Sequence, residues 1–101
     1  MSRYVLSVAA ESDLNEIWAY IAEDSPDAAD RWIDKLFDAF ESLAKTPGIG
    51  HKRLDLTDFP IRFWSVGAYL VLYSSAQENF IQIVAVTQGA RDIPTFLSQR
   101  S

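Results

Sequence analysis

The chain has no cysteine and only one histidine, His51, among its 101 residues. Without cysteine no disulfide can form, and a conventional zinc site built from cysteine and histidine ligands is excluded. Glycine is scarce too, and Gly48-Ile49-Gly50 follows a helical pattern and precedes none, which excludes a glycine-rich phosphate loop. The composition therefore predicts neither a bound metal nor a cofactor.

Long apolar runs are also missing. No segment approaches the roughly 18 apolar residues of a membrane-spanning helix, and the amino terminus lacks the apolar stretch of a signal peptide. We therefore expect a soluble, cytoplasmic protein without membrane contact. Hydrophobic residues still make up 49% of the sequence, which is enough for a real core, so we predict one domain over residues 1–101.

Positive charge is scarce in one half of the chain. The net charge is −5, and residues 1–50 hold ten acids against four Lys or Arg, while residues 51–101 hold four acids against five. Strong binding to a phosphate backbone needs a dense basic patch. Direct nucleic-acid binding by the chain alone is therefore not expected, and only the second half offers a weakly basic surface.

Three consecutive strands are predicted in residues 61–92. Residues 69–73 (YLVLY) are apolar on both faces of a pleat, which is typical of a central strand, and residues 80–87 (FIQIVAVT) follow the same pattern. Gly67-Ala68 and the polar residues 77–79 separate the three segments. Both connections are short enough for antiparallel hairpins.

Two amphipathic helices precede these strands. Apolar residues recur every three or four positions over residues 9–23, and Ser7 can cap this helix. A longer helix begins after Ser25 and Pro26 and ends at residues 46–50 (TPGIG). Because only a short turn joins the helices, we expect them to lie antiparallel.

The predicted fold class is α+β with the element order β-α-α-β-β-β. Residues 3–8 suit a short strand added to the later sheet, and residues 93–97 suit one turn of helix. An antiparallel helical hairpin would then pack on one face of a mainly antiparallel sheet.

No catalytic group stands out in the sequence. His51 lies in a polar segment without a nucleophile-elbow pattern, and the many helix carboxylates are expected on solvent faces, where their pKa would not be raised. Trp18 and Trp32 fall on the helix stripes, where they are either core residues or contacts for a partner.

The chain resembles the toxins of the RelE/ParE superfamily, which belong to bacterial type II toxin–antitoxin pairs, and most of all the ParE branch. The matching positions span nearly the whole chain: Asp13, Leu14, Ile17, Trp18, Tyr20, Ile21, Ala22, Ala28, Ala29, Leu36, Leu43, Ala44, Pro47, Gly50, Arg53, Leu56, Arg62, residues 69–73, Ile81, Ile83, Val86 and residues 89–92. Each match is weak alone, but their order and spacing together are specific.

The resemblance implies two possible targets, because one branch cleaves messenger RNA on the ribosome and the ParE branch inhibits DNA gyrase. The RNA-cleaving branch uses a tyrosine or histidine near the carboxyl terminus for proton transfer. Here Gln88 stands where many relatives carry histidine, and the only aromatic residue after Arg91 is Phe96. The resemblance thus favours a non-enzymatic toxin that inhibits gyrase, with no catalytic residue. A ribosome-dependent endoribonuclease and a degenerate, non-toxic antitoxin-binding module are the alternatives.

Two interaction surfaces follow from the resemblance. The candidate target-binding residues are the cations of the second half: Lys52, Arg53, Arg62, Arg91 and Arg100. A cognate antitoxin, ParD-like or other, is implied as the partner in a hetero-oligomer. Its candidate anchors are Trp18, Trp32 and Phe40, for which core packing is the competing interpretation.

Overall fold

The computed structural model describes residues 3–75, 80–89 and 92–100. The elements are β1 (Arg3–Leu6), α1 (Val8–Ala22), α2 (Pro26–Lys45), the 3-10 turn η1 (Pro47–Ile49), β2 (Arg62–Val66), β3 (Tyr69–Ser74), β4 (Phe80–Gln88) and α3 (Ile93–Arg100). The predicted order β-α-α-β-β-β is confirmed. The carboxyl-terminal helix is longer than the single turn expected from the sequence.

The four strands form one mixed sheet in the order β1-β4-β3-β2. β3 pairs antiparallel with both β2 and β4, which confirms that YLVLY is a central strand. β1 joins the far side of β4 in parallel, with Leu6 opposite Ile83. The sheet is therefore mainly antiparallel, as predicted.

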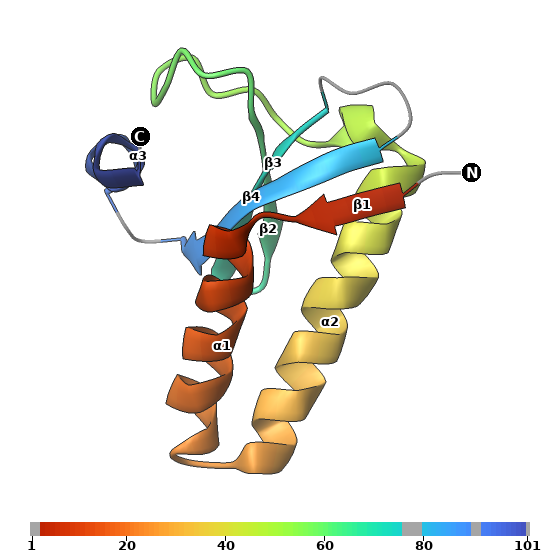
Figure 1. The fold of residues 1–101 in the computed structure, drawn as a ribbon, viewed down its shortest axis with the longest axis vertical. Coiled ribbons are helices and arrows are strands. Elements are labelled where there is room, and N and C mark those ends of the chain that lie inside the picture. Colours follow the sequence, from red (N-terminus) through yellow and green to blue (C-terminus); the bar gives the residue numbers. More distant parts are fainter. Residues whose placement is uncertain (1–2, 76–79, 90–91, 101) are drawn as a thin grey trace.

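Both long helices begin at the predicted caps. The Ser7 side chain accepts a hydrogen bond from the Ala10 amide, and the Ser25 side chain accepts one from the Ala28 amide, each satisfying a free helix N–H. Pro26 occupies the start of α2, where a missing N–H does no harm. Figure 1 shows the resulting antiparallel hairpin, with its turn at one end of the molecule.

The sheet is covered on both faces. On one face α1 and α2 pack over the sheet, and Val71 and Tyr73 of β3 are fully buried there. On the other face Leu72 is buried in one core with Phe96 and Leu97 of α3 and with Ile61, which precedes β2. The alternation of YLVLY between the two faces is thus confirmed, and α3 closes a second, smaller core.

β1 is shorter than β4, so the edge of β4 continues without a strand partner beyond Ile83. Side chains of Ser7 and Asp13, in the first half of the α1 region, bond the backbone of β4 there. The Ser7 hydroxyl donates to the Val84 carbonyl at 3.0 Å, and an Asp13 carboxylate oxygen accepts from the Val86 amide at 3.0 Å. Because an unpaired backbone group at a buried edge is costly, these two residues fix α1 against β4.

Candidate functional site

An apolar groove lies between the two helices of the hairpin and β1, with a volume of ≈ 290 Å³. Its apolar lining comes from all three elements: Leu6, Leu14, Trp18, Ile33 and Phe37. Glu11 and Asn15 also line it and supply polar groups. We call this the Trp18 groove, because its largest side chain is Trp18.

Trp18 is 40% exposed although it lies on the apolar stripe of α1. Its indole N–H donates to a carboxylate oxygen of Asp30 on α2 at 2.8 Å, which holds the ring in place across the hairpin. A fixed and accessible tryptophan beside an apolar groove is a typical anchor point for a partner side chain. That Trp18 contacts a partner stays a prediction, and the structure adds that Trp18 lines an apolar groove.

The other two predicted anchors lie elsewhere. Trp32 is half-buried and packs edge-on against Tyr69, with ring centroids 5.4 Å apart, while the Lys35 amine lies 4.8 Å from the Trp32 ring centroid. Phe40 is 0% exposed in the hairpin core. Phe40 thus offers no surface to a partner, and the core-packing interpretation replaces its predicted anchor role because its stripe faces the sheet.

Lys52 and Arg53 are exposed, in the segment between η1 and β2. The Arg53 guanidinium donates two hydrogen bonds to the Asp55 carboxylate, at 2.9 and 2.7 Å. This bond raises the pKa of Arg53 and lowers the pKa of Asp55 from their ordinary values. Arg53 is therefore already occupied by an anionic partner.

Arg62 is half-buried and donates from Nη1 to the Gly50 carbonyl at 2.9 Å, so it ties β2 to the turn after η1. Arg91 and the side chain of Arg100 lie outside the described residues. Of the five predicted cations the structure thus describes the side chains of three, Lys52, Arg53 and Arg62, and it gives Arg62 a structural contact.

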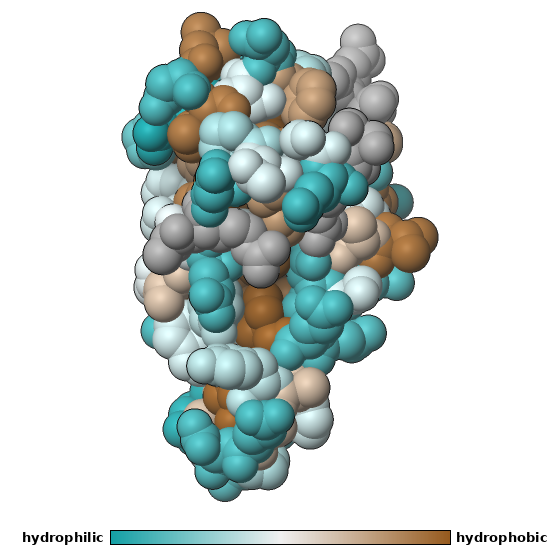
Figure 2. All heavy atoms as spheres, turned by 90° about the vertical axis from the view of Figure 1, so that its left-hand side faces the viewer, coloured by the Kyte–Doolittle hydropathy of each residue, from teal (hydrophilic) through white to brown (hydrophobic). Residues whose placement is uncertain are grey.

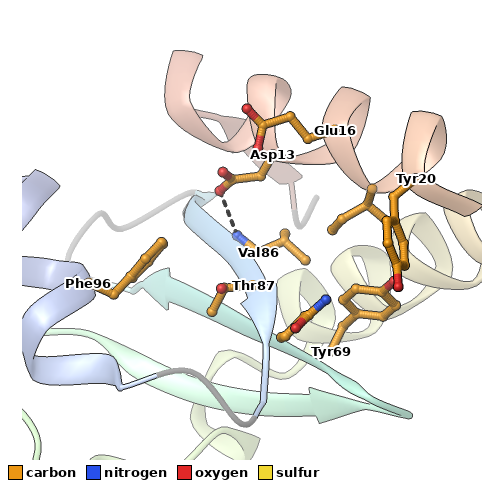
Figure 3. Close-up of a pocket in the computed structure, with 9 residues that line it drawn as sticks. Asp13, Glu16, Tyr20, Tyr69, Val86, Thr87 and Phe96 are labelled. Carbon is orange, nitrogen blue, oxygen red and sulfur yellow. Dashed lines mark hydrogen bonds between the residues drawn. The ribbon is translucent and has the colours of Figure 1, made fainter.

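A second recess, of ≈ 340 Å³, opens between α1, the sheet and α3. Figure 3 shows Asp13, Glu16 and Tyr20 reaching it from α1, with Thr87 on β4 and Phe96 on α3. The face drawn in Figure 2 carries an apolar strip recessed between hydrophilic side chains. This recess is lined by two carboxylates and several aromatic rings.

Asp13 corrects the expectation that all helix carboxylates face solvent, because it is only 9% exposed. The sequence held a signal for this position: Asp13 lies three residues after Ala10 and four before Ile17, on the apolar side of the helix. The sequence pattern did not show why Asp13 is buried, which is its hydrogen bond with the Val86 amide at the edge of β4. Thr87, the last residue of the predicted strand segment FIQIVAVT, is 5% exposed.

Two groups that can transfer protons lie near the turn after α2. The Tyr73 hydroxyl donates to the Pro47 carbonyl at 2.6 Å and accepts from the Gly50 amide at 2.9 Å. Burial raises the pKa of this phenol, against smaller opposing effects of the Gly50 amide and Arg62. His51 is exposed and stacks on Trp64, with ring centroids 6.4 Å apart. Tyr73 thus serves as a structural clamp.

Neither a metal centre nor a membrane helix is found within the described ranges. Among residues 3–75, 80–89 and 92–100, no cluster of three or more histidines or carboxylates is arranged to hold a metal ion. In the same part of the chain, no helix has the length and hydropathy needed to cross a membrane.

The fold has a counterpart among solved structures. A chain from the structure "Chromosomal ParDE TA system from P. aeruginosa" superposes with a TM-score of 0.69, covering 87% of this chain and 96% of that one. The two sequences are 17% identical, so this likeness shows a shared α+β fold.

Sequence comparison then gives the family. Proteins called Toxin ParE1, from Mycobacterium tuberculosis strains CDC 1551 / Oshkosh and H37Rv, are 31% identical over 93 residues, which cover 91% of this chain and 94% of each relative. The sequence model described as "ParE toxin of type II toxin-antitoxin system, parDE" matches residues 4–93. The chain belongs to this family of ParE toxins, as the resemblance predicted.

Proposed function

We propose that this ParE-family toxin inhibits DNA gyrase in the cytoplasm and so blocks replication, by binding and without catalysis of its own. The observation that carries the proposal is the match of residues 4–93 to the parDE toxin family. A binding mechanism agrees with the contacts of Tyr73, because its hydroxyl already bonds Pro47 and Gly50.

The contacts of the two described candidate arginines, Arg53 and Arg62, also agree better with binding than with RNA cleavage. A ribonuclease of the RelE type needs cationic groups free to stabilise the scissile phosphate. Here the Arg53 guanidinium is bound to Asp55, and Arg62 donates to the Gly50 carbonyl. Releasing either residue for a phosphate would break an existing contact of the toxin.

Expression of the chain alone in a bacterial host tests the target. We expect growth arrest with filamentation, gyrase-linked DNA breaks and continuing translation. Rapid translation arrest with cut messenger RNA would instead establish the ribonuclease alternative, and the absence of any growth defect would establish the degenerate, non-toxic one. Purified gyrase supercoiling a relaxed plasmid, with and without the toxin, gives the same answer in solution.

We further propose that a cognate antitoxin forms a hetero-oligomer with the toxin by laying an amphipathic helix into the Trp18 groove. The groove has the apolar floor that such a helix requires. Its surroundings are acidic, with Glu11 lining it and Asp30 bound to Trp18. An antitoxin helix with apolar anchors flanked by Arg or Lys would complement this surface.

A pair of substitutions on α1 tests the groove. Trp18→Ala removes the exposed anchor, and we expect affinity for the antitoxin encoded beside the toxin to fall by about 10- to 100-fold, as for other interface anchors. Tyr20→Ala is the matched control, because Tyr20 is an aromatic residue of the same helix, 65% exposed and outside the groove. Calorimetry on both variants decides: equal losses, or none, would contradict the placement.

A further inference from the structure

The segment between His51 and Phe63 is a loop whose two ends are held together. The His51 amide donates to the Phe63 carbonyl at 2.9 Å, and the Phe63 amide donates to the His51 carbonyl at 2.8 Å. Residues 52–61 between them contain turns and bends but no helix or strand. Compact surface loops of this length with closed ends are frequently functional. We call this segment the 52–61 loop.

The loop is ordered by its own hydrogen bonds. The amides of Leu56 and Thr57 both donate to the Arg53 carbonyl, at 2.9 and 3.1 Å, and the Phe59 amide donates to the Thr57 hydroxyl at 3.1 Å. The paired side chains of Arg53 and Asp55 add a further link. These bonds hold the backbone of the loop, which lowers the backbone entropy lost when a partner binds.

The apolar side chains of the loop divide into two groups. Ile61 is buried and Leu56 half-buried in the core beneath α3. Leu54 and Phe59 point outward instead, with 75% and 46% of their surface exposed. The loop therefore offers two large apolar side chains, five residues apart in sequence, to a binding partner. Figure 2 shows apolar side chains among hydrophilic ones at this end of the molecule.

The charges of the loop identify the kind of partner. Lys52 and Arg53 are balanced by Asp55 and Asp58, so the loop carries no net formal charge. Contact with a phosphate backbone depends on cations that are free to replace its counterions, and Arg53 is bound to Asp55. Nucleic acid is thus a poor match. A protein surface with a neutral, nonpolar pocket fits both the charge balance and the exposed side chains.

We propose that the toxin binds its target protein through the 52–61 loop, with Leu54 and Phe59 as anchors in a nonpolar pocket of that target. This inference rests on the proposed action as a toxin that binds a protein. The loop lies at the opposite end of the molecule from the turn of the helical hairpin (Figure 1). None of the residues that line the Trp18 groove belongs to the 52–61 loop, so substitutions can separate toxicity from antitoxin binding.

The test compares exposed apolar residues on and off the loop. Leu54→Ser and Phe59→Ser, singly and together, remove the anchors without touching the core. Val8→Ser is the matched control, because Val8 is 85% exposed at the first position of α1. Growth arrest in the host, inhibition of purified gyrase, antitoxin binding and urea denaturation are measured on all four variants.

We expect each single loop variant to inhibit gyrase about 10-fold less than the unsubstituted toxin, and the double variant to lose growth arrest. Antitoxin affinity and the urea midpoint remain unchanged, and Val8→Ser behaves as the unsubstituted toxin. Inhibition should change little with salt concentration, because apolar contacts do not depend on counterion release. A steep decrease with salt would mean that phosphate contacts, and not the apolar anchors, hold the target.

The outcomes also separate this inference from the proposed gyrase target. Growth arrest that requires Leu54 and Phe59 but leaves gyrase unaffected would support the loop and overturn gyrase as the target. Gyrase inhibition that both substitutions leave intact would overturn the loop and keep the target. Loss of antitoxin binding by folded loop variants, or a toxin that arrests nothing before any substitution, would overturn the loop as the target surface.

Discussion

The two faces of the sheet differ in how much they bury. Among the described residues, the large side chains with less than 2% exposure are Tyr73, Phe40, Leu36, Leu43, Leu72, Ile81, Ile83 and Val71, and of these only Leu72 lies on the α3 face. The hairpin face is covered by two long helices adjacent in sequence. The α3 face is closed by an eight-residue helix and by Ile61 and Leu56 of the 52–61 loop.

The two faces therefore differ in their contribution to stability and in the apolar surface that they expose. Because the hydrophobic contribution grows with the apolar area removed from water, most of the stability should come from the hairpin face. The α3 face buries a smaller core, and the 52–61 loop with its exposed apolar residues packs against that core. The following predictions test that division, from the largest expected effect to the smallest.

Phe40→Ala should produce the largest loss. The ring is 0% exposed and contacts Tyr4 and Phe37, with centroids 5.6 and 5.5 Å away, so its removal leaves a cavity under the hairpin. We expect the free energy of unfolding to fall by about 3–5 kcal/mol. Urea denaturation followed by circular dichroism measures it, and a loss below that of Phe96→Ala would reverse the ranking of the two faces.

Phe96→Ala should cost less, about 2–3 kcal/mol, because the ring keeps 7% exposure and a short helix can move to fill part of the space. Hydrogen exchange should show α3 opening while α1 and α2 stay protected. Simultaneous opening of all three helices would mean that the two cores form one cooperative unit.

Tyr73→Phe keeps the ring in the hairpin core and removes only its hydroxyl. The buried Gly50 amide then loses its acceptor and the Pro47 carbonyl its donor, for which we expect a loss of about 1–2 kcal/mol. The denaturation midpoint checks this value. An unchanged midpoint would show that water replaces the hydroxyl and that the clamp contributes nothing.

Alkaline pH should lower the free energy of unfolding through tyrosines of the hairpin face, and this should be the smallest and most gradual of the predicted effects. Burial raises the pKa of Tyr73 and Tyr69 above 10.0, and it raises that of Tyr4 with help from Glu41. A raised folded-state pKa gives stability that is complete below the unfolded value and declines as pH rises above it. Urea midpoints should thus fall above about pH 10, and they should fall less in Tyr73→Phe. Among the described residues, the core beneath α3 contains no tyrosine, so it should be insensitive to this change.

The candidate surfaces were only partly predictable, and the apolar stripes of the two helices show why. Trp18 and Phe40 both lie on such a stripe, and the sequence predicted both as anchors. The hairpin lies over the sheet near Phe40, whereas Trp18 lies farther along, where it keeps 40% exposure. How far a stripe reaches past the sheet depends on packing between elements, which local periodicity does not contain.

The sequence by itself determined the element order, the caps at Ser7 and Ser25, the central strand and the family, because caps, turns and periodicity depend on neighbours along the chain. Tertiary structure alone decided the burial of Asp13, since its reason is the Val86 amide 73 positions away. It also decided the closure of the 52–61 loop by the His51–Phe63 bridge and the second core beneath α3. Each of these depends on groups that meet only after the sheet has formed.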